Sequence, residues 1–272
     1  MAGVASGGHD EHQEAQTTSM TITERDLKGI AGWFDRHDLG AFQAVSAVQH
    51  AAGTTGDVLE IGAYKGRSTV VLRADLSPGE TLHVCDPFED PTGAAGNDAE
   101  NQRSYATLSR QEFDANLARF PGPAPVVHQT ISTDLAGQLS PGTFRLVHVD
   151  GSHLEGPVRF DLELARELLQ PGGVVICDDY RSPHTPGTAL AVWEAVGKGL
   201  VPVLTTPMKL YGSWDPDDDL VARLDRQLRG AGATTKWHKK DEGQDLLHTV
   251  ATDPPWWQSP RSLARKVLGS AR

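Results

Sequence analysis

Short apolar runs alternate with amphipathic stretches through the middle of this chain. The apolar runs are rich in aliphatic and β-branched residues and are bounded by turn-forming residues, which predicts strands at 57–61, 81–85, 126–128, 146–149 and 174–177. The intervening stretches have helical periodicity, which predicts helices over 70–76, 99–120, 133–139 and 157–169. Strands that alternate with helices form a parallel sheet, so the pattern predicts a doubly wound α/β fold.

The same pattern extends in both directions from this central part. Residues 21–34 and 39–52 predict two N-terminal helices, the first with Thr21 and Glu24 at capping-box spacing. A further helix is predicted at 187–198, and strands at 201–205 and 208–212 would complete a mostly parallel, seven-stranded sheet.

These elements predict three parts of the chain. Residues 1–20 are expected to be a disordered leader, 21–213 a single domain that includes the N-terminal helices, and 214–272 a C-terminal appendage. Within the appendage, the pattern predicts a helix at 217–229 and a strand near 245–250.

Composition narrows the function classes. The chain of 272 residues has a formal net charge of −11, whereas proteins that coat nucleic acid or anionic membranes need a positive surface, so we expect neither partner. The acids are concentrated in the leader, in 86–100 and in 215–219, which weakens this exclusion for the domain itself. No apolar run approaches the length of about 20 residues that crosses a bilayer, and the leader lacks the features of a secretion signal, which favours a cytoplasmic protein.

A glycine turn follows the first predicted strand of the sheet. Its pattern is Glu60-x-Gly62-x-x-x-Gly66-x-Ser68, which matches neither the G-x-G-x-x-G of dinucleotide-binding folds nor a Walker phosphate loop. Asp86, at the end of the second strand, has the position from which an acid accepts both ribose hydroxyls of a nucleotide. The pattern therefore favours a nucleoside without a pyrophosphate, although a tight strand-to-helix turn without a ligand remains the alternative.

Three acids follow two later strands. Asp150 comes directly after the fourth strand, and Asp178 and Asp179 follow the fifth. Neighbouring strands lie about 5 Å apart, so the three carboxylates would crowd together unless a cation such as Mg²⁺ or another divalent ion neutralised them. Each acid alone is equally well explained as a loop starter or helix cap, and His153 as a general base, an outer-sphere partner or a capping histidine.

The stretch LVHVDGSHLEGPVRFDLELARELLQPGGVVICDDY (146–180) resembles the metal-dependent sugar O-methyltransferases of the macrocin O-methyltransferase type, within the methyltransferase-24 group of class I S-adenosylmethionine-dependent methyltransferases. The resemblance covers about 55–213, and it departs from the family at Arg67 and at Ser152, where many relatives have an acid. It implies the following roles: S-adenosylmethionine held by Glu60, Gly62, Gly66, Ser68, Asp86, Ser132 and Asp150, with Thr133 less certain; Mg²⁺ held by Asp150, Asp178 and Asp179; and Asp150 or His153 as the base.

The resemblance implies an enzyme that methylates a hydroxyl of a sugar or a glycosylated small molecule. The alternatives are a catechol-like acceptor and a non-catalytic nucleoside-binding or assembly protein of the same fold. The long segment 87–103 lies over the expected site, which favours a lid, and a homo-oligomer is left open. In the strand order of this fold, Cys85 and Cys177 are about 14 Å apart, too far for a disulfide.

Overall fold

The computed structural model describes residues 21–105, 107–238 and 246–250. Its centre is a sheet with the order β3-β2-β1-β4-β5-β7-β6-β9-β8. The strands are β1 (Asp57–Ile61), β2 (Leu82–Cys85), β3 (Val126–His128), β4 (Phe144–Val149), β5 (Leu169–Cys177), β6 (Val201–Thr205), β7 (Leu210–Ser213), β8 (Thr235–His238) and β9 (Leu246–Thr249). The doubly wound α/β fold is therefore confirmed.

The seven strands from β3 to β6 are those that the apolar runs predict. Strands β1 to β5 pair in parallel, and β7 is antiparallel to both neighbours. The predicted total of seven is too low for the described residues, because β9 pairs with β6 and β8 extends the sheet further. Part of the segment after residue 213 thus continues the sheet, while the division of the chain at 213 stays a prediction.

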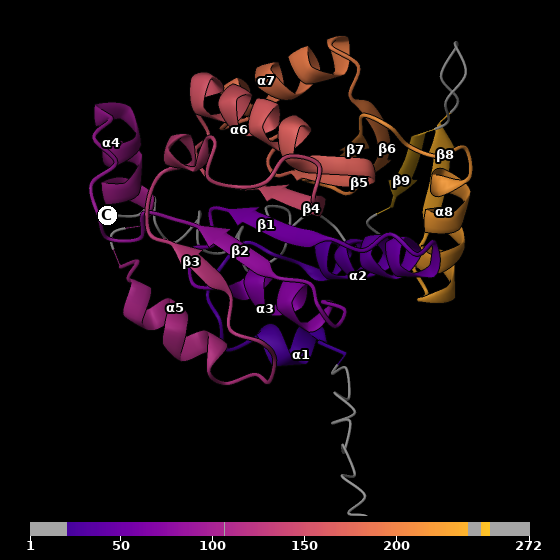
Figure 1. The fold of residues 1–272 in the computed structure, drawn as a ribbon, viewed down its shortest axis with the longest axis horizontal. Coiled ribbons are helices and arrows are strands. Elements are labelled where there is room, and N and C mark those ends of the chain that lie inside the picture. Colours follow the sequence, from indigo (N-terminus) through magenta and orange to yellow (C-terminus); the bar gives the residue numbers. More distant parts are fainter. Residues whose placement is uncertain (1–20, 106, 239–245, 251–272) are drawn as a thin grey trace, which may run out of the picture.

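Helices cover both faces of this sheet (Figure 1). They are α1 (Glu24–Leu27), α2 (Arg36–Ala51), α3 (Arg67–Ala74), α4 (Ala95–Ser104), α5 (Arg110–Leu117), the 3₁₀ helix η1 (Ser132–Leu135), α6 (Glu155–Leu168), α7 (Pro186–Gly197) and α8 (Leu220–Gly230). Helices α6 and α7 pack together on one face, and α8 packs against α2 on the other.

The strands are apolar on both sides, as strands covered by helices on both faces must be. Along β4, Leu146 packs in the core under α2 and α3, whereas Val147 packs in the core under α6 and α7. In β5 the neighbours Val174 and Val175 separate in the same way. Because side chains alternate between the faces, each short run contributes to two cores.

Three predicted helices are wrong in their extent or type. The one expected over 133–139 is the short 3₁₀ helix η1. The helix expected over 21–34 is limited to the four residues of α1, whose capping box is formed by Thr23 and Asp26, and not by Thr21 and Glu24. Gly32, at a φ of 147°, lies in the turns that follow. The helix expected over 99–120 is two helices, since the Ser109 side chain accepts the Glu112 amide and starts α5.

Three further expectations concern the whole chain. None of the described helices is long and apolar enough to cross a membrane. Cys85 on β2 and Cys177 on β5 are buried and free, with β1 and β4 between their strands, as expected. The predicted leader and the stretch from 251 lie outside the described residues.

Candidate active site

The predicted site residues gather where β1, β2, β4 and β5 end, which we call the carboxyl edge. This is the edge at which open α/β sheets bind ligands. Non-glycine residues with left-handed backbone follow three of these strands: Tyr64 (φ 47°), Phe88 (φ 53°) and Asp179 (φ 53°). Such conformations are uncommon outside glycine and concentrate at functional sites, so the backbone itself marks this edge.

The glycines after β1 allow close packing within the protein. Gly62 has a φ of 83°, and a Cβ atom there would overlap the carbonyl oxygen of Asp150. Gly66 has a φ of 84°, and its Cβ would lie 2.5 Å from a methyl group of Leu117 on α5. The glycine spacing predicts that a ligand approaches the backbone closely here. In the structure, these glycines allow the turn itself to pack closely against the end of β4 and against α5.

Asp86 locks this turn. Its Oδ2 accepts the amides of Ala63 (2.8 Å) and Tyr64 (3.0 Å), and its Oδ1 accepts the amide of Phe88 (2.6 Å). Burial raises the pKa of the Asp86 carboxyl, and the three backbone amides oppose this shift. A carboxylate has about four acceptor positions, so the three amides leave one for a ligand, whereas the sequence pattern predicts an acid that accepts both ribose hydroxyls.

The other predicted cofactor residues lie at different depths. Glu60 is fully buried, and its carboxylate accepts Thr69 Oγ1 at 2.5 Å and lies 3.1 Å from His148 Nδ1. Ser68 is buried in the first turn of α3, whereas Ser132 is half-buried at the start of η1, where its hydroxyl bonds to Asp161. Glu60 and Ser68 thus lie behind the turn, and Ser132 lies nearer the surface.

The structure brings Asp150 and Asp178 together and places a lysine beside them. Lys209, in the connection between β6 and β7, has its Nζ 2.8 Å from Asp178 Oδ2 and 3.6 Å from Asp150 Oδ2. The lysine side chain is fully buried, while those of Asp178 and Asp150 are 11% and 27% exposed. The ammonium group therefore lies on the inner side of the carboxylates, whose outer side is open.

The pKa shifts at this cluster follow from burial and charge. Burial, with the charge of Asp178 adding to it, raises the pKa of Asp150 well above its ordinary value. For Asp178 burial is the largest cause and acts in the same direction, but the charge and hydrogen bond of Lys209, together with a hydrogen bond to Asp150, outweigh it and lower the pKa. Burial alone would lower the pKa of Lys209, yet Asp150, Asp178 and Asp38 together hold it above its usual range. The cluster therefore keeps a permanent internal positive charge.

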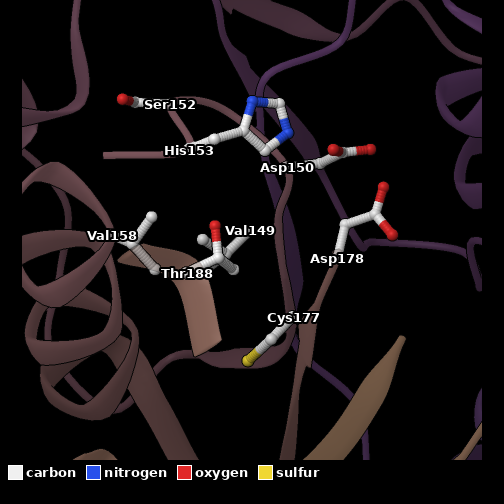
Figure 2. A pocket seen from close by; sticks show the side chains of 8 residues that line it. All are labelled: Val149, Asp150, Ser152, His153, Val158, Cys177, Asp178 and Thr188. Carbon is white, nitrogen blue, oxygen red and sulfur yellow. The ribbon is translucent and has the colours of Figure 1, made fainter. Parts of the chain in front are cut away.

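The third predicted ligand, Asp179, faces a different partner. Its Oδ2 lies 3.3 Å from His153 Nε2, so Asp179 pairs with the histidine. Figure 2 shows His153, Asp150 and Asp178 around a small cavity that is otherwise lined by Ser152 and by apolar and small side chains. Three of the four residues that the sequence placed at the ends of β4 and β5 thus line one cavity, and Asp179 contacts one of them, His153.

A series of buried polar side chains extends inward from this cluster, and the sequence pattern does not predict it. Lys209 Nζ lies 3.3 Å from His148 Nε2, and the opposite nitrogen of that ring faces Glu60, which in turn accepts Thr69 Oγ1. Glu60 and His148 are directly paired in the register of β1 and β4. The local sequence shows only a lysine before an apolar strand at this position. No local pattern indicates which side chains Lys209 contacts.

The donor chemistry of the cluster fits a divalent cation. Asp150, Asp178 and Asp179 supply hard carboxylate oxygens, the ligand type that Mg²⁺ prefers. Three carboxylates and one ammonium group leave a formal charge of −2, which a divalent ion would balance. Among the described residues, however, no three His, Cys, Asp or Glu side chains are already arranged as a metal site.

Comparisons with known proteins found a matching family model and similar folds. Residues 59–180 match the family model for the methyltransferase domain of the methyltransferase-24 type. The fold is similar to that of the O-methyltransferase NovP (TM-score 0.53, 21% identity, 66% of this chain and 80% of that one). It is also similar to that of a Corynebacterium glutamicum protein (TM-score 0.52, 16% identity, 73% and 94% coverage). No curated protein matches the sequence.

Proposed function

Since this chain carries a methyltransferase-24 domain and is a class I S-adenosylmethionine-dependent methyltransferase, we propose that it methylates a hydroxyl group of a sugar or a glycosylated small molecule with the help of Mg²⁺. The observation that carries the proposal is the meeting of Asp150, Asp178 and His153 around one cavity, with Asp179 paired to His153 at 3.3 Å. Transfer to oxygen needs a group that takes the hydroxyl proton, and this cluster supplies carboxylates and an imidazole for that task. The fold of an O-methyltransferase, NovP, is consistent with it.

In this proposal, the cofactor and the acceptor bind at two different parts of the carboxyl edge. Asp86 would hold the ribose, the turn from Gly62 to Gly66 the methionine part, and Ser132 the adenosine end. S-adenosylmethionine, when bound, supplies a methyl group that is already electrophilic. Because the Gly62 turn packs on the backbone of Asp150, the cofactor turn and the acidic cluster are held at a set separation, which favours in-line transfer.

The acidic cluster would bind Mg²⁺ through Asp150, Asp178 and Asp179. When bound, the ion supplies a Lewis acid that makes a substrate hydroxyl more acidic. We assign proton acceptance to His153, since Asp179 orients its ring from 3.3 Å and the ring borders the cavity. Asp150, which also borders the cavity, is the other candidate base.

Aromatic side chains beside the glycine turn support a ring-shaped acceptor. Trp33 is 67% exposed, and its ring lies 5.5 Å from that of Tyr64 and 5.9 Å from that of Tyr105. Tyr64 belongs to the turn from Gly62 to Gly66, so this aromatic group borders the cofactor turn. Exposed aromatic faces stack on the apolar face of a sugar or on an aromatic ring.

Helix α4 supports the proposed lid. It lies in the segment 87–103 that the sequence assigned to a lid, and Asn97 on α4 is 2.9 Å from Ser152 Oγ beside the cavity. A helix joined to the site by this contact would cover the acceptor when it closes. Unchanged proteolysis of 87–103 with cofactor and acceptor bound would count against the lid.

The test is methyl transfer from labelled S-adenosylmethionine to a panel of sugars, glycosides and catechols, with and without a chelator. The proposal expects label on a sugar or glycoside and loss of transfer after metal removal, restored by Mg²⁺. Transfer only to catechols would change the acceptor class, and full activity in the chelator would remove the metal from the mechanism. Asp178→Asn is the matched inactive control.

A further inference from the structure

The buried ammonium of Lys209 is an unusual companion for a proposed metal site. It lies on the inner side of Asp150 and Asp178, where it contacts Asp178 at 2.8 Å. Burying a charge is costly unless it is paired, so a lysine is retained here only because the acids offset the cost. The ammonium group already balances part of the charge that a metal would balance.

The surroundings hold this ammonium group in place. The Lys209 amide donates to Thr206 Oγ1 (3.1 Å), and that hydroxyl donates to Asp38 on α2 (3.0 Å). The Phe34 ring lies on one side of the Nζ atom and the His148 ring on another, at 5.9 Å and 3.3 Å. The group therefore has no exposed route along which to leave when a second cation arrives.

We infer that the ammonium group of Lys209 neutralises part of the negative charge of Asp150 and Asp178 that a metal would otherwise neutralise. It thereby weakens the binding of a divalent ion by this pair. This inference rests on the proposed function for the metal site, and it concerns a residue that touches the ligands and not the acceptor. Like charges a few ångströms apart repel strongly in a partly buried site. Lys209 thus positions Asp178 and at the same time lowers the affinity of the cluster for metal.

A Lys209 that neutralises charge and a Lys209 with a purely structural role would respond differently to substitution. Removing the ammonium group without opening a cavity should tighten metal binding, whereas loss of a structural contact would weaken it or leave it unchanged. Lys209→Met keeps the length of the side chain, and Lys209→Gln keeps a donor for Asp178 while removing the charge. If the first variant does not fold, the second still tests the idea.

The experiment measures Mn²⁺ binding to the full chain by electron paramagnetic resonance, with thermal unfolding as the check that each variant is folded. We expect Lys209→Met and Lys209→Gln to lower the Mn²⁺ dissociation constant by about tenfold or more. Lys198→Met is the matched control, because it removes one positive charge from the exposed pair with Glu194 on α7. Its Mn²⁺ affinity should equal that of the wild type.

The outcomes separate this inference from the proposed function. Tighter binding by both variants supports it, and if the wild type then binds no Mn²⁺, Lys209 serves as the cation and the magnesium part of the proposed function fails. Variants that bind no more tightly than the wild type overturn the inference, however the wild type behaves. Measurable Mn²⁺ binding by the wild type would leave the proposed metal site standing in that case.

Discussion

The two halves of the carboxyl edge are built by different means. The cofactor half, formed by Gly62–Gly66 and Asp86, depends on backbone: positive φ angles, close approach to Asp150 and three amides directed at one carboxylate. The acceptor half, formed by Asp150, Asp178, Asp179 and Lys209, depends on side-chain charge. The cofactor half should therefore be sensitive to shape, and the acceptor half to the loss of a single charge.

Asp178→Asn should have the largest effect and should affect the acceptor half alone. Asparagine keeps the size but cannot balance Lys209 or a metal, so we expect kcat to fall by about a thousandfold, or about 4 kcal/mol. Binding of S-adenosylhomocysteine, measured by calorimetry, should stay within about twofold of the wild type, because no cofactor contact is changed. A parallel loss of cofactor binding would mean that the two halves are not independent.

Gly62→Ala tests the cofactor half by shape. An added Cβ would meet the Asp150 backbone at a φ of 83°, so we expect a loss of about 3 kcal/mol in the free energy of unfolding, measured in urea. Gly79→Ala is the matched control: its φ is 91°, but no atom lies within 4 Å, so only backbone strain of about 1 kcal/mol should appear. Equal losses would show that conformation, and not close approach, makes Gly62 necessary.

Asp86→Asn should affect the cofactor half and leave the acceptor half unchanged, which is the reverse of Asp178→Asn. The amide keeps one acceptor oxygen but cannot accept all three backbone amides, so the turn should loosen and S-adenosylhomocysteine affinity should fall about tenfold, or about 1.4 kcal/mol. Mn²⁺ binding at the acceptor half should not change. A shift in Mn²⁺ affinity would reveal that the two halves are energetically coupled.

Asp161→Asn should have the smallest effect on methyl transfer, and its effect on stability tests a buried charge behind both halves. Burial raises the pKa of Asp161 from 3.8 to about 7, and its Oδ1 has no hydrogen-bond partner among the described residues. Because the folded-state pKa is the higher one, the wild type loses stability as pH rises from about 4 to about 7. Removing the group should abolish this loss, so the variant should gain about 4 kcal/mol over the wild type across that range, because the pKa is raised from 3.8 to about 7.

The measurement for Asp161→Asn is urea unfolding of both chains at several pH values. Stability curves that run parallel from pH 4 to pH 8 would contradict the raised pKa. The Ser132 hydroxyl can donate to asparagine as it does to aspartate, so the comparison isolates the charge.

Much of this architecture is predictable because its signals are local. An apolar run such as 57–61 or 146–149 can be buried on two faces only as a central strand, and the acids directly after β4 and β5 must then lie at one edge. Predictions failed where a tertiary contact decides the outcome. The run 21–34 has helical periodicity, yet its helix is limited to α1, and β8 has three exposed residues of four and no clear apolar pattern.

The positions of the central strands, the glycine turn and the acids at the carboxyl edge follow from the sequence alone, because periodicity and strand ends are properties of neighbouring residues. Only the tertiary structure decided how those acids are paired. Asp179 faces His153, and Lys209, 61 residues away from His148 along the chain, reaches the acidic cluster from the β6–β7 connection. A buried charge finds its partners through the packing of distant elements, and no local pattern contains that information.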